Sequence, residues 1–309
     1  RVVVAMASFL MALLLVHLSD SAAWAIFPTL CQWALLAGVL LAVLLYCRWN
    51  GMAAMTLATT AVLGVVWYGL HYRASYFSVT ATFGWIFTGL FLGYAVWAHR
   101  RETEPSKFPR LMAAAMGLLM AMLVCVLSRS ASWAAMPALG HWIALTAVML
   151  GLMLWCRWDE LLLKVVAVAG AGSLIWLVGE ARWPAAPTLR IVLFWALFGV
   201  SAGVPFVGML VRRLKDVTAQ RAMILAGSAV VLQCVLLPKM AMTPLWHVGV
   251  LTVLTLGVAY WRRWHGARLA TLVWAVVTGG AVYLLVGQST ENMAPWLVCS
   301  WGLYALFTA

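Results

Sequence analysis

Four histidines are the side chains of this sequence best suited to bind a metal ion or to transfer a proton. Imidazole is a common metal ligand and titrates near neutral pH. His17, His71, His141 and His247 each lie close to one end of a long apolar segment. No two of them have the close helical spacing of a metal-binding pair. We therefore expect no metal site and favour interfacial positions for all four.

Glu180 and Arg182 form a second polar candidate, in a loop that also contains Trp183 and Pro184. These two polar residues can be specialised for binding a substrate, although a loop exposed to water is the simpler interpretation. If Glu180 converged in space with His71, His141 and His247, the group could act on lipid-linked molecules at a membrane surface. This enzyme hypothesis is the least favoured, because the residues come from separate loops.

The segment Gly199–Pro205 has a composition that can interrupt a helix. Proline removes one backbone hydrogen bond, and glycine leaves the backbone accessible. In many transporters such a broken helix lines the substrate site; alternatively, small residues let a kinked helix pack closely against its neighbours. A water-accessible cavity would be lined by Ser201, Gln233, Thr252 or Thr278. The candidate substrate-binding residues are Ser201, Gly203, Pro205, Gln233, Glu180 and Arg182.

Charged side chains are almost absent from the apolar segments. Ion-coupled carriers and membrane enzymes place ionisable groups inside the bilayer, because coupling and catalysis need groups that hold or move charge. Lys164 is the deepest basic residue, and its long side chain can reach the membrane surface; a contact with a substrate phosphate is the alternative. The eight acidic residues all fall in loops or at segment ends: Asp20, Glu102, Glu104, Asp159, Glu160, Glu180, Asp216 and Glu291.

The sequence contains none of the short motifs that mark common catalytic sites. It has no phosphate-binding loop, no zinc-protease helix and no serine nucleophile elbow. The six cysteines form no close pair with metal-ligand spacing. We therefore expect no catalytic residue, no cofactor, and a protein that is not an enzyme.

The composition predicts an integral membrane protein. Of the 309 residues, 66% are hydrophobic and 9% are charged, whereas soluble domains carry about 25% charged residues. The 19 tryptophans suit the interfaces between membrane and water, where an apolar ring with a polar N–H is favourable. The net charge of +12 does not indicate nucleic-acid binding, because the basic residues lie singly or in pairs between apolar runs.

An internal repeat organises the chain. Residues 19–49 align without gaps on residues 128–158, and 15 of the 31 positions are identical. A weaker third copy matches Pro244 to Pro137 and Arg263 to Arg157. The sequence therefore predicts three four-helix repeats, at 1–109, 110–220 and 221–309.

Twelve apolar segments are candidates to cross the membrane, since about 20 helical residues span about 30 Å. They lie near 2–18, 29–46, 52–70, 81–98, 111–127, 138–155, 161–178, 191–211, 222–237, 245–260, 269–286 and 296–309. The fold prediction is an all-α membrane protein of about twelve transmembrane helices, in three tandem four-helix repeats that comprise six helical hairpins.

The loops alternate in charge, and this alternation predicts the orientation. Of the 20 basic residues, 15 fall on one side of the predicted membrane, together with both ends of the printed sequence. We call this the basic side and expect it to face the cytoplasm, at the inner membrane of a bacterium; the opposite side is the far side. The last segment stops short of the basic pair that ends its counterparts, so we expect a longer chain.

Three functions fit these patterns. The first is a permease for a neutral or lipid-like substrate without obvious ion coupling, which the twelve segments and internal repeats favour. The second is a structural subunit of a larger envelope assembly, favoured by uniform hairpins without a charged centre. The third is the lipid-active enzyme described above. Membrane lipid is the expected partner, with other proteins or further repeats of the same chain as additional partners, and no nucleic acid.

Overall fold

The computed structural model is all-helical within the residues that it describes. These are residues 10, 11, 14, 26–101, 107–131, 133–179, 187–236 and 243–286, and no strand occurs among them. Five helices are long and apolar enough to cross a membrane: α2 (Ile26–Cys47), α3 (Asn50–His71), Ala74–Arg101, α5 (Phe108–Ser128) and α6 (Ala135–Cys156). The predictions of an all-α fold and of an integral membrane protein are confirmed at this level.

Ten of the expected apolar segments correspond to α-helices in this part of the chain. The segment Ala74–Arg101 consists of a 3-10 turn, η2 (Ala74–Tyr76), followed by α4 (Phe77–Arg101). The remaining helices are α7 (Asp159–Gly179), α8 (Pro187–Leu210), α9 (Asp216–Leu236), α10 (Thr243–Arg262) and α11 (His265–Val286). The first and last expected segments, 2–18 and 296–309, lie largely outside the described residues, so the count of twelve remains a prediction.

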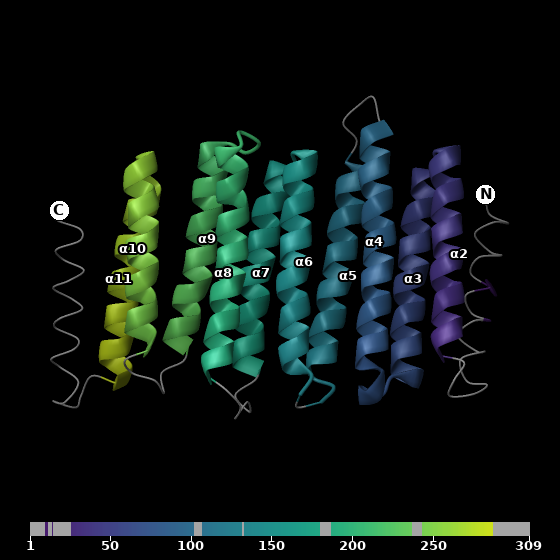
Figure 1. Ribbon diagram of the computed structural model, residues 1–309, viewed down its shortest axis with the longest axis horizontal. Helices are drawn as coiled ribbons and strands as arrows, with labels where there is room; N and C mark the ends of the chain where they lie inside the picture. Colours follow the sequence, from purple (N-terminus) through teal and green to yellow (C-terminus); the bar gives the residue numbers. More distant parts are fainter. Residues whose placement is uncertain are drawn as a thin grey trace. The chain divides into compact units, whose positions relative to one another are not determined.

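The chain divides into two compact units, Arg1–Leu145 and Thr146–Ala309, with the boundary inside α6. In the first unit, α4 packs against α2 and α5, and α3 also contacts α2 and α5 (Figure 1). In the second unit, α9 contacts α7, α8, α10 and α11. The division of the sequence into three repeats remains a prediction.

Arginine in a left-handed backbone conformation forms the tight turns at the basic ends of several helices. Arg48, Arg157, Arg212 and Arg263 have φ angles of 56° or 57°, which few residues other than glycine adopt. In three turns the next residue is a tryptophan, and its backbone N–H donates to the carbonyl five residues earlier: Trp49 to Leu44 (3.0 Å), Trp158 to Met153 (2.8 Å) and Trp264 to Ala259 (2.8 Å). These bonds satisfy carbonyl groups that the helix end would otherwise leave without a donor.

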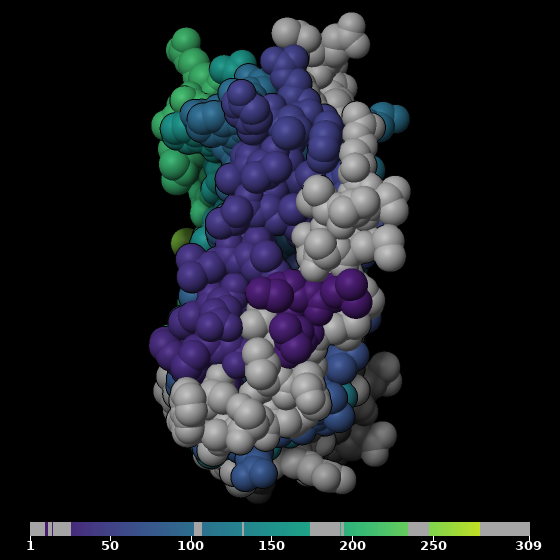
Figure 2. Space-filling view, turned by 90° about the vertical axis from the view of Figure 1, so that its right-hand side faces the viewer, coloured from purple at the N-terminus to yellow at the C-terminus, as the bar shows by residue number. Residues whose placement is uncertain are grey.

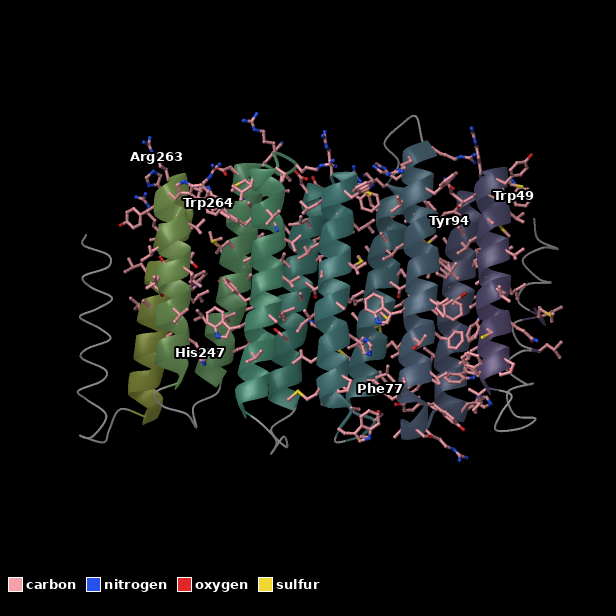
Figure 3. The ribbon with its side chains drawn as sticks, viewed as in Figure 1. Trp49, Phe77, Tyr94, His247, Arg263 and Trp264 are labelled. Atoms are coloured by element: carbon pink, nitrogen blue, oxygen red, sulfur yellow. The ribbon has the colours of Figure 1, made fainter. Side chains whose placement is uncertain are left out.

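Two of the three tryptophans in these turns are buried in the protein. Trp158 and Trp264 are only 1% and 4% exposed, whereas Trp49 is partly exposed. Trp264 lies at the same end of the second unit as Arg263, and His247 lies nearer the other end (Figure 3). In two of the three turns, the tryptophan that follows the arginine therefore belongs to the protein interior.

Substituting Arg157 with glycine is expected to raise the free energy of unfolding by about 0.5–1 kcal/mol. Glycine adopts the left-handed region without the steric cost that a Cβ atom imposes. The matched variant Arg157→Val should instead lower stability, since a β-branched residue is least tolerant of positive φ. Denaturant titration in detergent micelles would measure both. A glycine variant less stable than the parent would show that contacts of the arginine side chain outweigh the backbone strain.

The surface of α2 faces the viewer on one side of the first unit (Figure 2). Two of its large apolar side chains are well exposed, Leu35 at 69% and Val39 at 63%. Exposed apolar side chains of this kind are unfavourable in water but need no special explanation in hydrocarbon. The exposed face of α2 is therefore consistent with contact with lipid.

Candidate functional site

An apolar cleft lies among four helices of the first unit. Its volume is about 270 Å³, just below the range of about 300–1,000 Å³ that is usual for ligand pockets. Helices α2, α3, α4 and α5 all contribute to its walls. The principal lining side chains are Leu30, Trp33, Leu57, Thr60, Trp67, Tyr68, Phe83, Phe87, Met116, Met120 and Leu123.

The cleft occupies the far half of the first unit, away from the turn at Arg48. Helices α3 and α5 run from the basic end to the far end, and they line the cleft through residues 57–68 and 116–126. Helices α2 and α4 run in the opposite direction and line it only as far as Trp33 and Phe87. A molecule bound here would therefore lie in the half of the membrane next to the far side.

Two glycines show why a space remains between these helices. A Cβ atom built on Gly84 would lie 2.6 Å from Leu123 Cδ2, so α4 and α5 approach each other closely at this point. A Cβ atom built on Gly64 would have no neighbour within 4 Å, so α3 leaves open space beside this residue. The close contact of α4 with α5 and the missing side chain at Gly64 together leave the cleft unfilled.

The walls of the cleft are mostly apolar and aromatic. The rings of Trp33 and Phe87 pack edge to face with centroids 5.3 Å apart. The hydroxyl of Thr80 is already used, because it donates to the Tyr76 carbonyl at 2.8 Å. The indole N–H of Trp67 is buried and has no acceptor among the described residues. Such a wall suits an apolar chain.

A polar bridge joins the far ends of α3 and α5. The Tyr72 hydroxyl donates to Ser130 Oγ at 2.8 Å, and Ser130 Oγ donates to the Leu127 carbonyl at 2.7 Å. The ring of Tyr72 stacks on that of Tyr68 with centroids 4.3 Å apart. The bridge therefore ties the far end of α3 to the end of α5, beyond the cleft residues Tyr68 and Val126.

Two of the four histidines are engaged in hydrogen bonds between helices. In the first unit, Trp85 Nε1 donates to His141 Nδ1 at 3.1 Å, and in the second unit, Trp195 Nε1 donates to His247 Nδ1 at 2.9 Å. An Nδ1 that accepts a hydrogen bond carries no proton, so each ring is neutral with its proton on Nε2. These contacts assign both histidines a role in packing.

The described residues bring together no metal-binding or catalytic cluster of histidines. Within them, no group of three His, Cys, Asp or Glu side chains is arranged to hold a metal ion. His71 Nδ1 lies 3.2 Å from the carbonyl of Trp67, one helical turn earlier. His17, Glu180 and Arg182 lie outside the described residues.

Helix α8 is continuous through the segment expected to interrupt it. Ser201, Gly203 and Pro205 all lie within Pro187–Leu210, and Pro205 stands inside the helix. Of the two alternatives for this segment, the broken helix is therefore not observed in this structure. A Cβ atom on Gly208 would lie 2.6 Å from Leu154 Cδ2. Close packing therefore occurs at Gly208, three residues beyond the segment, whereas a Cβ atom on Gly199 or Gly203 would have no neighbour within 4 Å.

Gln233 is bonded to another helix in the interior of the second unit. Its Nε2 donates to Ser173 Oγ at 2.6 Å, and Ser173 Oγ donates to the Gly170 carbonyl at 2.6 Å. Hydrogen bonds of this kind between membrane helices contribute about 0.6–2 kcal/mol. Ser201, Thr252 and Thr278 are also buried, at 3% exposure or less. None of these four side chains faces open solvent.

Asp216 at the basic end of the second unit is a feature that the sequence did not single out. Arg262 Nη2 donates to Asp216 Oδ1 at 2.8 Å, and Trp264 Nε1 donates to Asp216 Oδ2 at 3.0 Å. The Trp264 hydrogen bond and then the Arg262 guanidinium lower the pKa of Asp216 from its ordinary value of 3.8, against an opposing effect of burial. The carboxylate therefore joins the start of α9 to the end of α10 and the turn after it.

Replacing Asp216 with asparagine is expected to lower stability at neutral pH by less than about 1 kcal/mol, because the ion pair is partly exposed and therefore screened. A carboxyl group whose pKa is lowered by folding stabilises the protein above its ordinary pKa, and this contribution is lost as the pH falls through the lowered value. The two proteins should thus converge in unfolding free energy in acid. Chemical unfolding across the acid range would measure this, and a difference that persisted unchanged would contradict it.

Sequence reasoning missed the cleft, although one signal was present. Thr60, Ala61 and Gly64 place small side chains on one face of α3, a pattern that allows either close packing or a recess.

No family model matches the chain, and no curated protein and no solved structure shows significant similarity to it.

Proposed function

We propose that this integral membrane protein is a permease for a lipid-like substrate, which binds in the apolar cleft of the first unit. The cleft itself is the observation that carries the proposal. Its aromatic and methionine side chains suit an alkyl chain, since methionine adapts its shape to irregular ligands. An inorganic ion would need polar ligands, and the walls provide few of them.

The lack of carboxylates supports a lipid-like molecule over a coupled ion. The described residues of the first unit contain no Asp or Glu, so proton or sodium coupling through a carboxylate has no basis there. Because most basic residues lie in the loops of one side, we propose that this side faces the cytoplasm of a bacterium and that the cleft lies in the opposite leaflet of the membrane.

A structural subunit of a larger envelope assembly is the second candidate, favoured by the packing of the second unit. A Cβ atom on Gly170 would lie 2.9 Å from Ala229 Cβ, and Gln233 bonds to Ser173 nearby. A protein that only supports partners has no need for a saturable lipid site. The two candidate functions therefore differ in whether lipid binds saturably in the cleft.

The test uses a lipid with a photoreactive diazirine at the end of one acyl chain. The full chain would be reconstituted in nanodiscs with this lipid, irradiated, digested and analysed by mass spectrometry. We expect adducts concentrated in residues 57–68 and 116–126, and we expect excess unlabelled lipid to reduce them selectively. Adducts distributed evenly over lipid-facing residues such as Leu35 and Val39, without competition, would reject the permease proposal and leave the structural subunit.

A further inference from the structure

Two arginines lie at the far ends of α3 and α5, the two helices that line most of the cleft. Arg73 follows the end of α3, five residues after the cleft residue Tyr68, and Arg129 caps α5, three residues after the cleft residue Val126. Both side chains are exposed. Because three residues make almost one helical turn and Arg129 has α-helical angles, Arg129 lies above Val126 on the face of α5 that borders the cleft.

A hydrogen bond between their immediate neighbours places the two arginines at the same end of the cleft. Tyr72 precedes Arg73 and Ser130 follows Arg129, and the Tyr72 hydroxyl donates to Ser130 Oγ at 2.8 Å. The ring of Tyr72 in turn stacks on Tyr68, in the cleft wall. Arg73 and Arg129 are therefore next to the same bridge, and their long side chains can both reach a group bound beside it.

The charge of these arginines is not compensated by nearby carboxylates of the described chain. Residues 26–101, 107–131 and 133–145 of the first unit contain no aspartate or glutamate. Asp20 lies outside the described residues. Two guanidinium groups at a membrane surface attract an anion, and guanidinium binds phosphate through paired, charge-assisted hydrogen bonds.

We propose that Arg73 and Arg129 bind the phosphate of a lipid whose apolar chain occupies the cleft. This inference rests on the proposed function and narrows the substrate from a lipid-like molecule to a phosphate-bearing lipid. The head group lies at the far side, beside the Tyr72–Ser130 bridge, and the chain extends between α3 and α5 toward Met116. The cleft supplies affinity for the chain, and the arginines supply selectivity for the head group.

The test compares two lipids with identical acyl chains, phosphatidic acid and diacylglycerol. The purified full chain would be titrated with each in neutral detergent, and bound lipid counted by native mass spectrometry. We expect phosphatidic acid to bind about tenfold more tightly, and the double variant Arg73→Gln/Arg129→Gln to bind the two lipids about equally. The matched control Arg100→Gln/Lys107→Gln removes two charges from the basic end of the same unit and should keep the preference.

Each outcome decides the proposal. The inference is overturned if the parent protein shows no preference, or if the double arginine variant keeps it. If excess inorganic phosphate abolished the preference for phosphatidic acid over diacylglycerol, the site would be assigned to the free anion, and the lipid assignment would be overturned. Saturable binding of diacylglycerol without a phosphate preference rejects only this inference, whereas absence of saturable binding for both lipids rejects the proposed function.

Discussion

Replacing Gly64 with phenylalanine is expected to abolish saturable lipid binding while the protein remains folded. Gly64 lines the cleft near the middle of α3, and a Cβ atom there has no neighbour within 4 Å. A phenyl ring would therefore enter the cleft rather than collide with another helix. Because the ring and an acyl chain cannot share the same volume, we expect affinity to fall by about tenfold or more. Native mass spectrometry with diacylglycerol would measure the loss.

Gly69→Phe provides the matched control for this variant. Gly69 lies in the same helix, and a Cβ atom built on it also has no neighbour within 4 Å. It is exposed and does not line the cleft. Both variants replace a glycine inside a helix, which by itself tends to stabilise the helix. Unchanged binding in Gly64→Phe, or an equal loss in Gly69→Phe, would contradict a lipid site in the cleft.

Replacing Gly227 with alanine is expected to destabilise the second unit by about 1–3 kcal/mol, the usual cost of overpacking a core. A Cβ atom at this position would lie 2.7 Å from Trp274 Cζ3 and 2.8 Å from Cζ2. The indole is 5% exposed, and its Nε1 donates to Ser228 Oγ at 3.0 Å. It also packs in a cluster with Val230, Val231 and Leu251, so the ring cannot move away without breaking other contacts. The unfolding free energy in detergent micelles would measure the effect.

Gly257→Ala is the control for the Gly227 variant. Gly257 lies in α10, where a Cβ atom has no neighbour within 4 Å. Alanine is favoured over glycine in a helix interior by about 0.5–1 kcal/mol, so this variant should be slightly more stable than the parent. If Gly227→Ala were stabilised to the same extent, the close contact between α9 and Trp274 would not exist in solution.

The apolar segments could be predicted from the sequence because they depend on local composition. A run of about 20 apolar residues between polar turns specifies a membrane helix with little help from the rest of the chain. The structure confirms helices such as α2 and α5 for this reason. The continuity of α8 through Pro205 could not be predicted, since the same glycines and proline suit either a broken helix or a closely packed one.

The candidate site depended on contacts that composition does not specify. Gly64 and Gly84 are the same residue type in consecutive helices of the chain, yet one borders open space and the other lies close to Leu123. Gln233 resembled a substrate ligand as an isolated polar residue, and its bond to Ser173 appears only when α7 and α9 are packed together. Glu180 and Arg182 remain predictions, because they lie outside the described residues.

The arginine turns have a consequence for how the chain enters the membrane during synthesis. Only Arg48 and Trp49 separate α2 from α3, and only Arg157 and Trp158 separate α6 from α7. Two extended residues reach about 7 Å, whereas the hydrocarbon layer is about 30 Å thick. While such a turn is intact, its two helices stay side by side and antiparallel. Helices α2 and α3 are both long and apolar enough to span a membrane, so this hairpin would enter lipid as a pair, and the orientation of α2 would determine that of α3.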